Sequence, residues 1–253
     1  MAHRILITGA TGTLGARVVP AAAAAGHTVR ALSRRDRGDD GTVRWHRGDL
    51  LAGTGLDAAC DGVDTVVHCA TQPTGDKDVT SMRNLIAAAR VAGVGHLIGV
   101  SIVGIDRIPL PYYRTKLRVE EVLASSGLGH TVQRATQFHE LVTTTFAVQR
   151  FFPVVAALRG MSFQPIDTRD VAARLVELVD AGPAGRAPDI GGPAVHTHAE
   201  LARMYLNARG SRRPVVPIAL PGRIVAGYKS GAHCVPDHAV GTISYVEFLA
   251  ESQ

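Results

Sequence analysis

The chain has 253 residues, of which 46% are hydrophobic and 19% charged, so it is long enough to bury a sizeable core and does not have the composition of a disordered chain. Its formal net charge is +5, but the basic residues are spread along the sequence without a long block, which argues against a nucleic-acid partner. No apolar run reaches the roughly 20 residues that cross a bilayer, and no signal-peptide pattern opens the sequence, so we expect a cytoplasmic protein without a membrane partner.

The first predicted strand is followed at once by a glycine-rich loop. A strand pattern at residues 5–8 leads into the sequence GATGTLG at residues 9–15, and a helical pattern covers residues 13–25. Glycine permits backbone angles and a close approach that a side chain forbids, while a helix N-terminus offers free N–H groups to an anion. The pattern therefore predicts a strand, a loop that binds a pyrophosphate, and a helix.

Apolar runs then alternate with helical patterns through the first half of the sequence. Such alternation predicts a parallel sheet that is covered by helices on both faces. The expected further strands are residues 29–32, 43–46, 65–68, 97–101 and 131–134, and the expected further helices are residues 56–60, 79–92 and 112–125.

After about residue 150 the alternation loosens, because prolines interrupt it. Residues 167–179 still predict an amphipathic helix, which Asp167 or Thr168 would cap. A second helix is expected at residues 197–207, where Thr197 and Glu200 have the spacing of a capping box.

We therefore expect an α/β protein, a doubly wound parallel sheet of the Rossmann type with a small C-terminal substrate lobe. Residues 1–253 would form a single NAD(P)-binding domain, to which residues 151–253 or so contribute the smaller lobe. A lobe beside the carboxyl ends of parallel strands is where a substrate pocket would form.

The end of the second predicted strand indicates which dinucleotide binds. In this fold an acidic residue about 20 positions beyond the glycine loop normally binds the ribose hydroxyls of NAD. Here Ser33, Arg34 and Arg35 stand in that place, with Asp36 directly after them. Arginine pairs with a 2′-phosphate, which a carboxylate would repel. We expect NADP (NADPH) rather than NAD; the alternative is a solvated turn with unengaged arginines.

Tyr112 and Lys116 lie four residues apart at the start of a predicted helix, so they share one of its faces. A phenol has a pKa near 10, and a neighbouring ammonium lowers it, which suits the phenol to protonate a developing alkoxide. We predict Tyr112 as the proton donor and Lys116 as the residue that tunes it and binds the nicotinamide ribose. The alternative is a surface tyrosine and lysine on an amphipathic helix.

With these residues the chain resembles the short-chain dehydrogenase/reductase superfamily, and most closely its atypical NmrA-like or NAD(P)H-binding members. The matching segments cover roughly the first 140 residues: 8–15, 48–50, 67–70, 100–104, 112–121 and 134–139. The resemblance implies four groups of cofactor-binding residues: Gly9, Thr11, Gly12, Thr13, Leu14 and Gly15 at the pyrophosphate, Asp49 and Leu50 beside the adenine, Ala70 and Thr71 along the cofactor, and Thr136 and Phe138 near the nicotinamide.

The sequence departs from the family pattern at two positions. A catalytic serine usually lies just after the fifth strand, and our alignment puts Val103 there, two residues beyond Ser101. We therefore expect Ser101 to support the cofactor and not to take part in acid–base chemistry. Ala135 stands where relatives often have proline.

No metal site is predicted. The three cysteines are far apart, and apart from the His196-x-His198 pair the histidine spacings fit no standard ligand set. His139 follows the sixth predicted strand, where it is either a substrate contact or a helix-start histidine in solvent.

These observations predict an NADPH-dependent oxidoreductase that reduces a carbonyl, enone or quinone group of a small organic molecule by hydride transfer. A regulatory protein that senses the NADP(H) redox state and contacts a protein partner is the second hypothesis, because NmrA-like proteins include such members. An epimerase or dehydratase of nucleotide sugars ranks third, since the C-terminal lobe is small. The sequence leaves the substrate, the reaction direction and the choice between monomer and homodimer open.

Overall fold

The computed structural model describes residues 2–39, 41–72 and 75–252, and the chain divides into two compact units. The first unit comprises residues 1–101, 111–134 and 171–188, and the second comprises residues 102–110, 135–170 and 189–253. Each unit is therefore assembled from separate stretches of the sequence.

The first unit is built on a parallel sheet, which has seven strands within the described residues, in the order β3-β2-β1-β4-β5-β6-β9. The chain builds outward from β1 in both directions, which is the doubly wound arrangement expected from the sequence. The strands are β1 (Arg4–Thr8), β2 (Thr28–Ser33), β3 (Val43–Arg47), β4 (Thr65–His68), β5 (His96–Ile102), β6 (His130–Ala135) and β9 (Gly185–Arg186).

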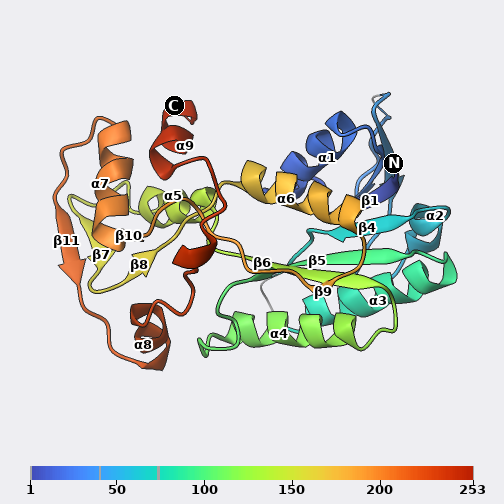
Figure 1. Ribbon diagram of the computed structural model, residues 1–253. Helices are drawn as coiled ribbons and strands as arrows, with labels where there is room; N and C mark the ends of the chain where they lie inside the picture. Colours follow the sequence, from blue (N-terminus) through green and yellow to red (C-terminus); the bar gives the residue numbers. More distant parts are fainter. Residues whose placement is uncertain (1, 40, 73–74, 253) are drawn as a thin grey trace. The chain divides into compact units, whose positions relative to one another are not determined.

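Helices cover both faces of this sheet, as Figure 1 shows for α1 and α6 on one face and α3 and α4 on the other. Burial of apolar side chains on both faces explains why the strands read as nearly continuous apolar runs. Leu6, Val66 and Leu97 lie between the sheet and the helices, with 0% exposure. The helices are α1 (Gly15–Ala24), α2 (Leu56–Cys60), α3 (Lys77–Val91), α4 (Pro111–Ala124) and α6 (Thr168–Ala181), of which residues 171–181 belong to this unit.

The second unit combines short strand pairs with helices around its own core. Phe146 and Tyr245 are fully buried in this core, and Leu201 packs with them. The strand β7 (Val155–Leu158) pairs in parallel with β11 (Val215–Ile218), and β8 (Ser162–Phe163) pairs antiparallel with β10 (His196–Thr197). The helices are α5 (His139–Ala147), α7 (His198–Ala208), α8 (Arg223–Lys229), the 3-10 turn η1 (Pro236–His238) and α9 (Tyr245–Glu251).

Both of the later helices expected from the sequence are present. α6 begins at Thr168, directly after Asp167. At the start of α7 the side chain of Thr197 accepts a hydrogen bond from the N–H of Glu200, whose carboxylate in turn accepts one from the N–H of Thr197. The predicted capping box is therefore confirmed.

The division of the chain differs from the lobe expected at residues 151–253. The second unit also includes residues 102–110 and 135–150, and residues 171–188 belong to the first unit. The reason lies in β9, where Gly185 and Arg186 pair with Thr131 and Val132 of β6 and so extend the central sheet. α6, which leads to β9, covers a face of the same sheet (Figure 1).

Candidate cofactor-binding and catalytic site

The glycine loop after β1 fits tightly against the end of β4. Gly9 has φ +67°, a left-handed conformation that favours glycine, and a Cβ there would lie 2.5 Å from the backbone nitrogen of Ala70. A Cβ at Gly15 would collide with the carbonyl of Gly9. The N–H of Gly12 donates to the same carbonyl at 2.9 Å, so the loop closes on itself.

The start of α1 is open to an anion. Leu14 is the N-cap residue and gives no side-chain hydrogen bond to the helix, whose first turn contains no acidic residue. Thr11, Gly12 and Thr13 are exposed in front of it. The positive end of the helix dipole favours negative charge there. The loop and the helix start together fit a pyrophosphate group.

The end of β2 supplies positive charge. Arg34 and Arg35 are exposed, and within the described part of the chain neither forms an ion pair. The neighbouring carboxylate of Asp36 is paired with Arg47 at 3.2 Å. Ser33 is buried, and its hydroxyl accepts a hydrogen bond from the N–H of Arg35 at 3.2 Å. The two guanidinium groups fit the charge of a 2′-phosphate.

The segment after β3 forms a turn that its own side chains hold. The Oδ1 atom of Asp49 accepts hydrogen bonds from the N–H groups of Leu51 and Ala52 at 2.8 and 3.1 Å. The side-chain amide of Asn84, from α3, donates to the carbonyl of Leu50 at 2.9 Å. The Asp49 carboxylate thus stabilises the turn through these hydrogen bonds. The contact of Asp49 and Leu50 with adenine stays a prediction.

Tyr112 is linked to the loop that follows β4. Its hydroxyl lies 2.8 Å from the hydroxyl of Thr71, which itself donates to the carboxylate of Asp78 at 2.7 Å. Thr71 follows Ala70, the residue against which Gly9 packs. The consecutive residues Ala70 and Thr71 therefore contact the glycine loop and the predicted proton donor respectively, within a single unit.

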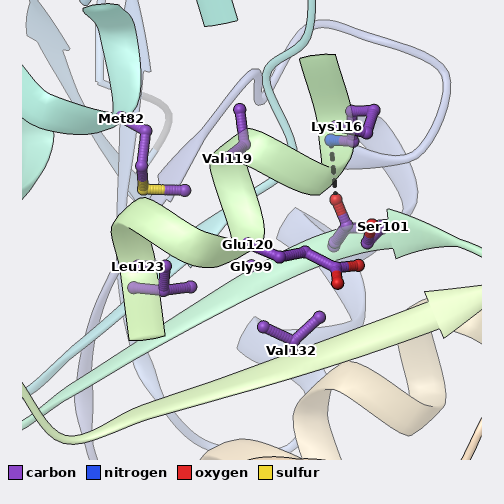
Figure 2. A pocket seen from close by; sticks show the side chains of 9 residues that line it. Met82, Gly99, Ser101, Lys116, Val119, Glu120, Leu123 and Val132 are labelled. Atoms are coloured by element: carbon purple, nitrogen blue, oxygen red, sulfur yellow. Dashed lines mark hydrogen bonds between the residues drawn. The ribbon is translucent and has the colours of Figure 1, made fainter. Parts of the chain in front are cut away.

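Lys116 is buried one turn further along α4. Its ammonium donates a hydrogen bond to the carbonyl of Val100 in β5 at 2.9 Å, drawn as the dashed line in Figure 2. Ser101 lies in the same small pocket, and its buried hydroxyl has no hydrogen-bond partner within the described residues. The pocket is mainly apolar and is lined by Met82, Gly99, Val100, Ser101, Lys116, Val119, Glu120, Leu123 and Val132.

Burial is the largest influence on the pKa values of both Tyr112 and Lys116. Burial raises the pKa of Tyr112 and the charge of Asp78 raises it further, whereas a hydrogen bond from Thr71 to the phenolate would offset part of this. Lys116, predicted to lower the pKa of Tyr112, directs its ammonium to Val100 instead. Burial lowers the pKa of Lys116, and Asp78, Glu120 and Cys69 oppose that change. The tuning of the phenol by Lys116 stays a prediction.

Other predicted residues belong to the second unit. Thr136 is buried with a hydroxyl that has no partner in the described residues, and Phe138 is the half-buried residue before α5. Val103 is completely buried, so an apolar side chain fills the position where relatives carry the serine. His139 is also fully buried, with its Nε2 3.1 Å from the Pro165 carbonyl, so the solvent-exposed alternative is wrong.

Asp78 is the site residue that the sequence analysis missed. It lies in the first turn of α3, where acidic residues are common because they favour the helix dipole. Nothing in the sequence distinguishes it from such a residue, and only the fold brings it to Thr71.

The described part of the chain brings together no group of three or more histidine, cysteine, aspartate or glutamate side chains suited to holding a metal ion. Among its helices, none has the length and apolar character that crossing a membrane requires.

Comparison with known proteins identifies relatives of the chain. Residues 9–181 match the protein family described as NAD(P)H-binding. A Streptomyces griseus protein named (4-alkanoyl-5-oxo-2,5-dihydrofuran-3-yl)methyl phosphate reductase is 34% identical over 205 residues, which is 78% of this chain and 70% of that protein. The photosystem II assembly factor Ycf39 of Trieres chinensis is 27% identical over 181 residues, 66% of this chain but only 57% of that protein.

The fold is shared with solved structures. The NADPH-dependent quinone oxidoreductase QOR2 of Escherichia coli, in complex with NADPH, superposes with a TM-score of 0.81 at 20% identity. The superposition covers 98% of this chain and 99% of that one. At this identity the likeness establishes the fold.

Proposed function

The chain belongs to the NAD(P)H-binding family, among the atypical NmrA-like short-chain dehydrogenases/reductases, and on this premise we propose that it is an NADPH-dependent oxidoreductase. Its substrate would be a small organic molecule with a carbonyl, enone or quinone group. Reductases among the relatives support the reaction class, and the two exposed arginines after β2 support NADPH over NADH.

One observation carries the proposal. Gly9 packs on Ala70, and the next residue, Thr71, contacts the hydroxyl of Tyr112. A proton donor is thereby linked through the backbone to the loop that fits the cofactor pyrophosphate. Lys116 follows on the same face of α4, where a residue four positions away is expected to lie.

Each residue then has a defined task. The start of α1 holds the pyrophosphate, and Arg34 and Arg35 bind the 2′-phosphate. When bound, NADPH supplies the hydride. Tyr112 donates its hydroxyl proton to the substrate oxygen that gains negative charge. Lys116 uses one ammonium hydrogen for Val100, which leaves two for the hydroxyls of the nicotinamide ribose.

The test is NADPH oxidation with a panel of quinones, enones and ketones. Tyr112→Phe is expected to lower kcat by about 10²–10⁴-fold, the range typical of general acids. Tyr113→Phe, which changes the buried neighbour of Tyr112 on the same helix, is the matched control and should keep most of the activity. Equal turnover in Tyr112→Phe and wild type would refute Tyr112 as the proton donor.

The regulatory alternative is favoured by two observations. Val103 is apolar and fully buried where a catalytic serine usually stands. Several relatives carry the name of an assembly factor. A protein of this kind would bind NADPH tightly, oxidise none of it with any member of the panel, and bind a protein partner with an affinity that depends on the cofactor redox state.

A further inference from the structure

The carboxylate of Asp78 lies beside the proposed proton donor, yet no step above uses it. Asp78 is 3% exposed in the first turn of α3. Its Oδ2 accepts the hydroxyl hydrogen of Thr71 at 2.7 Å, and its Oδ1 accepts the N–H of Gln72 at 2.5 Å. The Oγ1 atom of Thr71 lies 2.8 Å from the hydroxyl of Tyr112. Asp78, Thr71 and Tyr112 thus form one continuous chain of hydrogen bonds.

The direction of these hydrogen bonds follows from the number of hydrogens. An ionised carboxylate only accepts, and a threonine hydroxyl carries a single hydrogen. Because Thr71 donates that hydrogen to Asp78, its oxygen can only accept a hydrogen bond from Tyr112. The bond between Thr71 and Tyr112 therefore requires the phenol hydrogen, which a phenolate lacks.

We propose that Asp78 is a positioning residue that acts through Thr71 to keep Tyr112 protonated and its hydroxyl fixed before the reaction. The inference rests on the proposed reductase function and adds a residue to the same site. Asp78 prevents Thr71 from turning its hydrogen toward the phenolate, and its negative charge opposes the phenolate directly.

Two other charged groups, on or beside the helices that carry Tyr112 and Asp78, have partners of their own. Lys116, on the same helix, donates to the carbonyl of Val100. Asp76 immediately precedes α3, and its carboxylate pairs with Arg118 of α4 at 2.6 Å. Asp78 is thus the carboxylate that hydrogen bonds connect to the phenol.

The decisive variant is Asp78→Asn, which keeps the shape of the side chain but reverses the direction of the hydrogen bonds from residue 78 through Thr71 to Tyr112. The N–H of Gln72 requires an oxygen at the Oδ1 position, so the new amide NH₂ faces Thr71 and donates to it. Thr71 then gives its own hydrogen to the phenolate of Tyr112. We expect the titration midpoint of Tyr112 to fall by about one pH unit or more.

The measurement is phenolate absorbance during alkaline titration of the free protein. The chain has five tyrosines, so the titration of Tyr112→Phe is subtracted to isolate Tyr112. Asp76→Asn is the matched control, because it removes the same charge two residues away, from a carboxylate that pairs with Arg118. Thr71→Ser should titrate like wild type, since it keeps the hydroxyl.

Thr71→Val tests whether Asp78 acts through Thr71. This variant removes the acceptor of the phenol hydrogen, so the midpoint of Tyr112 should fall, and adding Asp78→Asn should then lower it only by the smaller, direct effect of removing the carboxylate charge. An unchanged midpoint in Asp78→Asn, an equal fall in Asp76→Asn, or a full additional fall in the double variant would each overturn the proposal. If Asp78→Asn does not fold, the contrast between Thr71→Ser and Thr71→Val decides, and equal midpoints overturn the proposal.

The titration needs neither cofactor nor substrate, so it separates this inference from the proposed function. If the protein shows the expected titration but oxidises no NADPH, the role of Asp78 stands and the proposed reductase function is refuted. If the protein oxidises NADPH but the titration midpoint of Tyr112 is unchanged in Asp78→Asn, the proposed function stands and the positioning role of Asp78 is refuted.

Discussion

The guanidinium of Arg134 forms two hydrogen bonds with the carboxylate of Glu120, from Nε to Oε1 at 2.8 Å and from Nη2 to Oε2 at 2.7 Å. The two side chains are only 4% and 13% exposed, and they join β6 to the helix that carries Tyr112 and Lys116. Removing one partner of a buried ion pair leaves an uncompensated charge. We therefore expect Glu120→Gln to lower the free energy of unfolding by about 3 kcal/mol, measured by urea denaturation.

The exposed pair of Arg174 and Glu177, one turn apart on α6, provides the control. Solvent screens such pairs, so Glu177→Gln should change the free energy of unfolding by less than about 0.5 kcal/mol. Similar losses in the two variants would show that burial of the Glu120 pair has no energetic consequence.

The glycine loop leads to a second prediction. Gly9→Ala combines a left-handed backbone with a collision against Ala70, whereas Gly26→Ala has φ +84° and open space around its Cβ. Gly26→Ala should therefore cost about 1 kcal/mol of unfolding free energy, and Gly9→Ala distinctly more. Thermal unfolding and NADPH titration together check this, because Gly9→Ala alone should weaken cofactor binding. Equal losses of stability and equal affinities in the two variants would be inconsistent with the loop geometry.

The arginines after β2 lead to a third prediction. Arg34→Ala combined with Arg35→Ala should weaken NADPH binding by about 10²–10⁴-fold, because charge-assisted hydrogen bonds contribute about 1.5–3 kcal/mol each. Binding of NADH, which lacks the 2′-phosphate, should stay nearly unchanged. Fluorescence titration with both cofactors measures the ratio of NADPH to NADH affinity. The control is Arg37→Ala, which removes a guanidinium that lies over the ring of Trp45. A similar change in the ratio of NADPH to NADH affinity in this variant would contradict the assignment.

A fourth prediction concerns acid sensitivity. Burial lowers the pKa of His68 to about 3, and its Nδ1 lies 2.7 Å from the hydroxyl of Thr8. Between about pH 6.5 and pH 3 the unfolded chain binds a proton at this histidine and the folded chain does not. The free energy of unfolding should therefore decrease as the pH falls through this window, by about 1.4 kcal/mol per pH unit for this group.

Urea denaturation at several pH values between 4.5 and 7 measures this slope. His68→Asn retains an acceptor near Thr8 but cannot take up a proton in this range, so its slope should be smaller. His238→Asn alters an exposed histidine and should leave the slope as in wild type. Identical slopes in all three proteins would mean that His68 does not control the acid sensitivity.

The first unit was predictable because its strands are buried on both faces and its helices are periodic. β4 (Thr65–His68) and α2 (Leu56–Cys60) have the bounds expected from the sequence. α1 begins at Gly15 and not at residue 13, because the loop uses the preceding residues to close on Gly9. The glycine spacing therefore predicted the loop better than it predicted the start of the helix.

The second unit was predicted less well. β8 and β10 have two residues each, which is too short for any alternation of apolar and polar side chains to show. α5 contains three consecutive threonines, which have low helix propensity, and burial of Val142 and Phe146 compensates. The site was affected in the same way: Tyr112 and Thr71 had recognisable motif positions, but the contact of Thr71 with Asp78 depends on tertiary structure alone.

The interleaving of the two units along the chain limits how either could be separated from the other. A fragment that ends near residue 150 would lack both α6 and β9, and so would leave β6 as an unprotected sheet edge. A single cut anywhere in the sequence releases neither unit whole. Truncation at one boundary is therefore expected to give aggregation-prone material, and in gene duplication or fusion the two units would be inherited as one indivisible piece.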